Sequence, residues 1–156
     1  MLFDAASLAT IGGALALIGG LIGSSIGIGI AGSAGVATLS EDSGQFRNVI
    51  ILASLPMTQT FYGLIVLILV ITAVVPNISA NGGSGAMVLG AGIVAAAAEC
   101  FSAIYQGKVC ASGISLLPKT KGSILTNSIM LAVFVELLGV LGLVFAIMSL
   151  TMLGLM

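Results

Sequence analysis

The sequence predicts an all-α membrane protein with four transmembrane helices, arranged as two tandemly duplicated helical hairpins. The mean hydropathy is +1.31, and only 6% of the residues are charged. Long charge-free stretches can cross a hydrocarbon core, for which a helix needs about 20 apolar residues. The two halves also align with each other when Gln59 is placed over Glu136. Together these observations place the chain among integral membrane proteins.

The elements follow from where the apolar stretches are interrupted. The expected helices lie near residues 6–38, 48–75, 84–116 and 123–153. The long apolar stretch after Arg47 has to turn back, and the run from Pro76 to Gly85 contains the residues that favour turns. Short links are expected at 39–47 and 117–122. Residues 1–77 then form the first hairpin and residues 78–156 the second.

Charge placement predicts the topology. Asp4 precedes the first apolar run without a basic residue, so no signal peptide of the usual form is expected and the first helix stays in the membrane. The basic residues lie at or near the hairpin links: Arg47, Lys108, Lys119 and Lys121. By the positive-inside bias, the links are cytoplasmic and both termini lie outside.

The cysteines and the glycines are interpreted as packing residues. Cys100 and Cys110 lie too far apart along one predicted helix to pair, and the chain has no histidine, so neither a transition-metal site nor a redox centre is expected. Small residues recur every four positions in the first helix, at Gly23, Gly27, Ala31 and Gly35. The third helix repeats the pattern at Ala95, Ala103, Gly107 and Ala111, with Glu99 in the intervening position. Such spacing lets helix backbones approach closely in lipid. A tightly packed homo-oligomer is expected.

Glu136 is the main functional candidate. It interrupts an otherwise charge-free apolar run between Gly122 and Met156. A carboxylate at mid-membrane depth costs about 2.5 to 3.5 kcal/mol on insertion scales, so an acid there indicates an ion or proton site. In the first half, Gln59 occupies the matching position. One chain therefore holds one such acid per four helices.

Oxygen-bearing groups gather on one face of the second helix. Leu55, Thr58, Gln59 and Tyr62 are spaced for a single helical stripe. Pro56 lacks an N–H and disturbs the local ladder, which turns backbone oxygens near Leu55 toward a ligand. Gln106 adds an amide oxygen from the third helix, and hard oxygen ligands of low net charge suit a small monovalent cation. The alternative for Thr58, Gln59 or Gln106 taken singly is hydrogen bonding between helices.

Three motifs resemble the proteolipid (K, or c-type) subunit of V-type and A-type rotary ATPases. They are Leu55 to Gly63 (LPMTQTFYG), Tyr105 to Val109 (YQGKV) and Val135–Glu136, with the glycine-rich first helix as context. The resemblance implies a c-ring-like rotor of identical copies in a prokaryotic plasma membrane. The chain would then be non-catalytic, because ATP chemistry occurs in other subunits. No organic cofactor and no nucleic acid is expected.

The same resemblance implies a ligand set for Na⁺, with H⁺ as the alternative ion. In sodium-pumping members the ion is held at positions that match Leu55, Thr58, Gln59, Gln106 and Glu136, and the supporting tyrosine matches Tyr62. The implied partners are copies of the chain, lipid, a stator subunit with an essential arginine and a central-stalk subunit at the cytoplasmic links. Plain solvated links are the alternative to the stalk contact. One acid per four helices favours a pump over a synthase.

Glu99 departs from the small-residue pattern of the third helix. It lies on nearly the same helix face as Gln106, about 10.5 Å away by helix rise. Three roles are open: a second exchangeable acid, a protonated carboxyl that donates a hydrogen bond, or a group that faces a wet or lipid-filled ring interior. If Glu99 carries ions, the count of one acid per chain fails.

Two other classes of protein are considered. A small proton-coupled secondary transporter of cationic drugs would place aromatic residues around its acid, but this chain has no tryptophan and only 2 tyrosines. A passive channel or scaffold leaves the oxygen stripe and Glu136 without a purpose. The rotor subunit is therefore the predicted function.

Overall fold

The structure, a computed structural model, describes residues 4–156 and contains only helices in that range. Helix α1 spans Ala5–Glu41, α5 spans Gly85–Thr120 and α6 spans Leu125–Met152. The second long helix, Ser43–Asn81, is a continuous rod with changes of helix type: η1 Ser43–Gln45, α2 Phe46–Ser54, η2 Leu55–Met57, α3 Thr58–Leu69, η3 Val70–Val74 and α4 Val75–Asn81. These 4 helices are long and apolar enough to cross a membrane. The predicted all-α class is confirmed.

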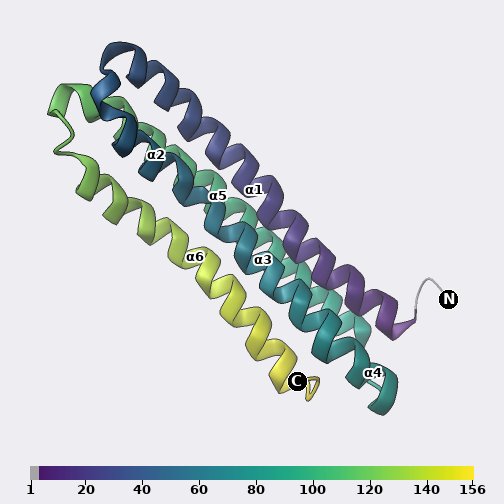
Figure 1. Cartoon of the computed structure of the whole chain (residues 1–156). Coiled ribbons are helices and arrows are strands. Elements are labelled where there is room, and N and C mark those ends of the chain that lie inside the picture. The colour runs from purple at the N-terminus through teal and green to yellow at the C-terminus, as the bar shows by residue number, and fades with distance from the viewer. Residues whose placement is uncertain (1–3) are drawn as a thin grey trace.

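The four helices run side by side, with both links at one end and the described ends of the chain at the other (Figure 1). Helix α1 packs against α5 along most of its length, α3 packs on α1, and α6 packs on α5. We call α1 and α5 the inner pair and the Ser43–Asn81 rod and α6 the outer pair. The most apolar part of each inner helix is 39% buried, against 28% and 22% for the outer two. The outer pair therefore presents most of the unpartnered apolar surface.

Glycines explain the close approach of α1 and α5. A β-carbon built on Gly12 would lie 2.7 Å from the carbonyl oxygen of Val88, and one on Gly23 would lie 2.7 Å from the α-carbon of Cys100. At Gly27 it would meet the backbone of Ala103. A side chain at any of these positions would force the helices apart, as the small-residue pattern predicts.

The turn between the hairpins is shorter than predicted. The second rod continues through Pro76 to Asn81, and the turn is confined to residues 82–84, where Gly82 and Gly83 have positive φ. A π-helical turn precedes Pro76, with the Val75 amide bonded to the Val70 carbonyl. Pro76 thereby falls in the first turn of α4, where no N–H donor is required. The expected helix end at 75 is wrong for this reason.

Helix α5 also runs past its expected end at 116. Pro118 has no N–H for the Ile114 carbonyl, and the Thr38 hydroxyl of α1 donates to that oxygen instead, at 3.0 Å. The helix ends at Thr120, where Lys121 adopts the left-handed conformation. A contact between helices that are distant in sequence therefore preserves a helix that Pro118 would otherwise end.

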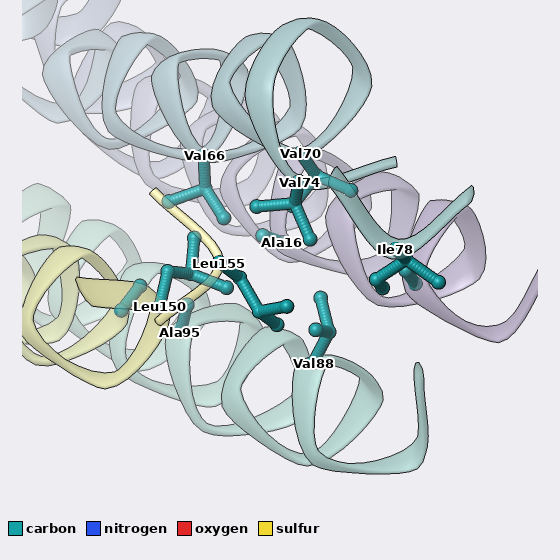
Figure 2. Packing of buried hydrophobic residues seen from close by; sticks show 11 residues of the cluster. Ala16, Val66, Val70, Val74, Ile78, Val88, Ala95, Leu150 and Leu155 are labelled. Carbon is teal, nitrogen blue, oxygen red and sulfur yellow. The ribbon is translucent and has the colours of Figure 1, made fainter. Parts of the chain in front are cut away.

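Two apolar clusters occupy the ends of the bundle. In the cluster near the termini, Val66, Val70, Val74 and Ile78 follow one face of the second rod and pack with residues of α5 and the C-terminal segment (Figure 2). The other cluster lies toward the links and contains Leu52, Ile114 and Leu117. Along each outer helix, the polar candidate residues lie between these clusters, so the fold encloses a polar layer.

Candidate functional site

The polar layer is formed by side chains of α3, α5 and α6. Thr58, Gln59 and Tyr62 come from the first turns of α3, Gln106 from α5 and Glu136 from α6. Hydrogen bonds connect all five side chains into one network. The fold thus brings together residues from both hairpins that the sequence places far apart.

Glu136 is the carboxylate that this network holds. Its Oε1 accepts from the Tyr62 hydroxyl at 2.9 Å, and its Oε2 accepts from Gln106 Nε2 at 3.2 Å. Both Glu136 and Tyr62 are half-buried. The carboxylate therefore lies at the edge of the bundle, between the outer helices, and Gln106 of α5 donates to it from the bundle interior.

The two glutamines form the buried part of the layer. Gln59 and Gln106 are both 0% exposed. Gln59 Nε2 donates to Gln106 Oε1 at 2.9 Å, and Gln106 Nε2 also donates to the Ala132 carbonyl at 3.4 Å. Because both hydrogens of each amide are engaged, the amide planes are held in place.

The Leu55 carbonyl lies at the start of this layer. Pro56 falls in the tight turn Leu55–Met57, and the Leu55 oxygen accepts from both the backbone amide and the hydroxyl of Thr58. The Thr58 hydroxyl also lies 3.1 Å from Gln59 Oε1. Hydrogen bonds therefore link Leu55, Thr58 and Gln59 directly, whereas Tyr62 joins the network through Glu136.

Ser102 belongs to the network and was not predicted. Its hydroxyl accepts from Gln59 Nε2 at 3.0 Å and donates to the Val135 carbonyl at 2.9 Å. It therefore connects α3, α5 and α6 beside Glu136. In the sequence, Ser102 could have been noticed because it lies one helical turn before Gln106, on the same face as Glu99. Serine is common in membrane helices, however, and the sequence does not reveal its hydrogen-bond partners.

The network has used its donors and retains unused acceptors. The Gln59 and Gln106 amides, the Ser102 hydroxyl and the Tyr62 hydroxyl all donate within the layer. Lone pairs remain on the amide and carboxylate oxygens. Within residues 4–156, no three histidine, cysteine or acidic side chains gather as a metal site. One carboxylate among neutral oxygens suits a monovalent cation rather than a transition metal.

Glu99 lies outside this network. It is 0% exposed, and neither of its carboxyl oxygens has a hydrogen-bond partner among the described residues. Because the chain itself encloses the side chain, Glu99 does not face a ring interior, and that alternative is wrong. Cys100 and Cys110 are free, with Cys110 buried in the apolar cluster near the links.

Comparisons with known proteins agree with this architecture. A family described as the C subunit of ATP synthase matches residues 11–70 and again residues 89–149. The V-type sodium ATPase subunit K of Enterococcus hirae is 37% identical over 123 residues, which cover 79% of this chain and 77% of the relative. The A-type ATP synthase subunit K of Methanocaldococcus jannaschii is 35% identical over 141 residues, which cover 89% of this chain and 62% of the relative.

The two family matches carry the assignment. They cover most of the chain, and each covers most of one inner and one outer helix of the bundle. The resemblance that the motifs predicted is thereby confirmed. The chain belongs to the family of ATP synthase C subunits, the non-catalytic membrane proteolipids of rotary ATPases.

Proposed function

We propose that this chain forms the rotor ring of a V-type or A-type ATPase and carries Na⁺ across the membrane on Glu136. The observation that carries the proposal is the arrangement around this acid, a half-buried carboxylate surrounded by neutral oxygens whose donors are already engaged. Such an arrangement suits a bound cation. Sodium is the preferred ion, since the relative from Enterococcus hirae is a sodium ATPase subunit.

Five residues would hold the ion. Glu136 supplies the charge, Thr58 a hydroxyl oxygen, Gln59 and Gln106 amide oxygens, and Leu55 a backbone carbonyl. Tyr62 would hold the carboxylate in position through the bond to Oε1. The direct bonds among these side chains support one shared site over separate contacts between helices.

The proposed mechanism follows from electrostatics. With an ion bound, Glu136 is electrically neutral and can face lipid, whereas the empty carboxylate is tolerated only beside water or a positive charge. An arginine of the stator subunit would supply that charge. Because Glu136 lies at the edge of the bundle, rotation of a ring can bring it to the stator and away again. Ion release and rotation are then coupled.

The remaining partners follow from the same assignment. Copies of this chain would form the ring and lipid would cover its free surfaces, while ATP would be hydrolysed in other subunits. The links would be cytoplasmic, at the plasma membrane of a prokaryote, and would contact the central stalk. At the first link, Asp42 accepts from Gln45 and Gln45 accepts from Asn48. These bonds, close to Gly122 of the second link, support a single ordered docking end.

One carrier acid per four helices favours a pump over a synthase. Moving one unit charge against 100 mV needs about 2.3 kcal/mol. A rotor with fewer acids per helix moves fewer ions in each turn and therefore spends more rotary work on each ion. Hydrolysis-driven transport against a steep gradient is the direction we propose.

Carbodiimide labelling tests the ion and the acid together, because the reagent modifies protonated carboxyls in membranes. Detergent-solubilised protein is labelled near neutral pH with sodium, with potassium or without either ion, and the modified residue is mapped. We expect Glu136 to be labelled, and sodium but not potassium to protect it. Protection only by raised pH would assign H⁺ as the ion. Labelling confined to Glu99 would overturn the assignment of Glu136.

A further inference from the structure

Glu99 is a buried acid that the proposed ion cycle does not use. It lies on α5 and faces Gly139 and Gly142 of α6. A β-carbon built on Gly139 would lie 2.9 Å from Glu99 Oε2, and one built on Gly142 would lie 3.5 Å from Oε1. The two glycines therefore leave the space that the carboxyl group fills. An acid accommodated this closely, without a partner, requires an explanation.

The Gly139 side of this space offers few ligands to a second sodium ion. Besides Glu99, the nearest polar atom there is the Ser102 hydroxyl, since a β-carbon on Gly139 would lie 3.1 Å from Ser102 Oγ. On the side near Gly142, the β-carbon of Ala98 closes the space. A hard cation needs several oxygen ligands. A proton needs only one.

An ionised Glu99 is also unfavourable. Neither oxygen has a hydrogen-bond partner among the described residues, Ser102 included, and burying a carboxylate without a partner is unfavourable. A neutral carboxylic acid avoids this cost and gains one donor. The donors of the adjacent layer are engaged, but Ser102 Oγ retains an unused lone pair, because it accepts only from Gln59 and donates to Val135.

We propose that Glu99 keeps a resident proton and, after a rotation of its carboxyl group, donates it to Ser102, a hydrogen bond that is not formed in this structure and that would position the ion site. Ser102 then holds the Gln59 amide and the α6 backbone beside Glu136 in a fixed relation. The inference rests on the proposed function, since it concerns the site at Glu136. Glu99 is a positioning residue, and each chain exchanges one cation although it contains two membrane acids.

Infrared spectroscopy tests the resident proton directly. A neutral carboxylic acid has a carbonyl band separate from that of a carboxylate, and at about pH 8 exposed carboxyls are ionised. We expect the wild-type protein to keep such a band at saturating sodium, the Glu136→Gln variant to retain it and the Glu99→Gln variant to lose it. Loss of the wild-type band on sodium binding would overturn the proposal.

Sodium binding tests the positioning role. We expect one sodium per chain, a dissociation constant raised about tenfold in Glu99→Val, as for one lost buried hydrogen bond, and recovery of most affinity in Glu99→Gln, whose amide can donate to Ser102. Two sodium ions per wild-type chain, or the same affinity in Glu99→Val as in wild type, would contradict the role.

Ser102 provides a second set of variants. Ser102→Ala should weaken sodium binding about tenfold, and Ser102→Thr should restore it. The matched control is Ser112→Ala on the same helix, because Ser112 donates only to the backbone of its own helix. Equal losses in Ser102→Ala and Ser112→Ala would argue against a positioning role.

The outcomes separate this inference from the proposed function. Absence of sodium binding by wild-type protein would overturn the sodium assignment. The band of the Glu136→Gln variant would still report on Glu99. If the Glu99 variants fail to assemble, the wild-type and Glu136→Gln spectra decide the proposal.

Discussion

The two hairpins share one architecture but differ at the position that we propose carries the ion. Gln59 of the first hairpin is 0% exposed and donates two hydrogen bonds into the bundle. Glu136 of the second hairpin is half-buried and accepts two. The first hairpin therefore contributes a buried hydrogen-bond donor to the polar layer, and the second contributes its carboxyl group.

The helices that carry these residues differ as well. The outer helix of the first hairpin changes type at Leu55–Met57 and again at Val70–Val74. Helix α6 is a continuous α-helix from Leu125 to Met152. In the irregular turn beside Pro56, the Leu55 carbonyl oxygen accepts from both the backbone amide and the hydroxyl of Thr58, which connects it to the polar layer. In the proposed function, the first hairpin supports the site and the second carries the ion.

Removing the charge of the second hairpin should have the largest effect. Glu136→Gln makes the two hairpins alike at this position and leaves no anion for the cation. We expect sodium affinity to fall about a hundredfold or more, as expected for losing one partner of a buried ion pair. Binding of isotopic sodium to the purified ring measures this affinity. Unchanged binding would refute the ion site at Glu136.

Giving the first hairpin an acid should damage the site instead of doubling it. In Gln59→Glu, the donors to Ser102 and Gln106 are lost, and each unpaired buried group costs about 1 to 3 kcal/mol. We expect sodium affinity to fall about thirtyfold, with no second ion bound. Stoichiometry by equilibrium dialysis checks this, and two ions per chain would show that the hairpins are interchangeable.

The bond that joins the hairpins at the carboxylate should have a smaller effect. Tyr62→Phe removes the donor at 2.9 Å from Glu136 Oε1. A hydrogen bond to a charged group is worth about 1.5 to 3 kcal/mol, so we expect affinity to fall about tenfold. Tyr105→Phe, on an exposed ring outside the network, is the control. A similar loss in both variants would argue against a specific role.

The contact between the inner helices should affect stability more than ion binding. In Gly27→Ala, the new methyl group would meet the Ala103 backbone and lie 2.8 Å from Pro56 Cβ, whereas a β-carbon built on Gly29 would meet no atom of another described helix within 4 Å. We expect Gly27→Ala to destabilise the protein by about 1 to 3 kcal/mol. Thermal unfolding in detergent compares the two. Equal destabilisation by Gly29→Ala would indicate that packing of α1 against another copy of the chain contributes as much stability as its packing within the chain.

The smallest effect is expected where the two inner helices begin. Asp4 caps α1 by accepting from the Ser7 amide at 2.9 Å, and hydrogen bonding from the Ser7 side chain, followed by that from the Ser7 amide, holds the pKa of Asp4 below its ordinary value of 3.8. The cap therefore stabilises α1 above that value and is lost as the pH falls through the lowered pKa. Ser84 caps α5 without a charge.

Amide hydrogen exchange distinguishes these two caps. As the pH falls through the lowered pKa of Asp4, the first turn of α1 should exchange faster than its intrinsic rate predicts, while the first turn of α5 should not change. Identical pH dependence of the two turns would show that the charge of Asp4 contributes nothing.

The helices were predictable because the membrane leaves few choices. Every backbone polar group in lipid must be bonded within its segment, so a long charge-free stretch is a helix. The predicted ends of the second and third helices were wrong, because they assumed that a proline ends a helix. Pro76 and Pro118 read as helix ends in the sequence, but a π-helical turn and the Thr38 hydroxyl accommodate them. Neither compensation has a sequence signal, since each depends on the packed neighbours.

By itself, the sequence determined the class of the protein, the number of its helices and the oxygen-bearing residues of the candidate site, because hydropathy and helical spacing act within single segments. Only the tertiary structure placed Ser102 in the network, enclosed Glu99 against Gly139 and left Glu136 half-buried. These features depend on which helix faces are in contact. In a chain where all four helices are apolar on every side, hydropathy does not specify those faces; small side chains and hydrogen bonds do.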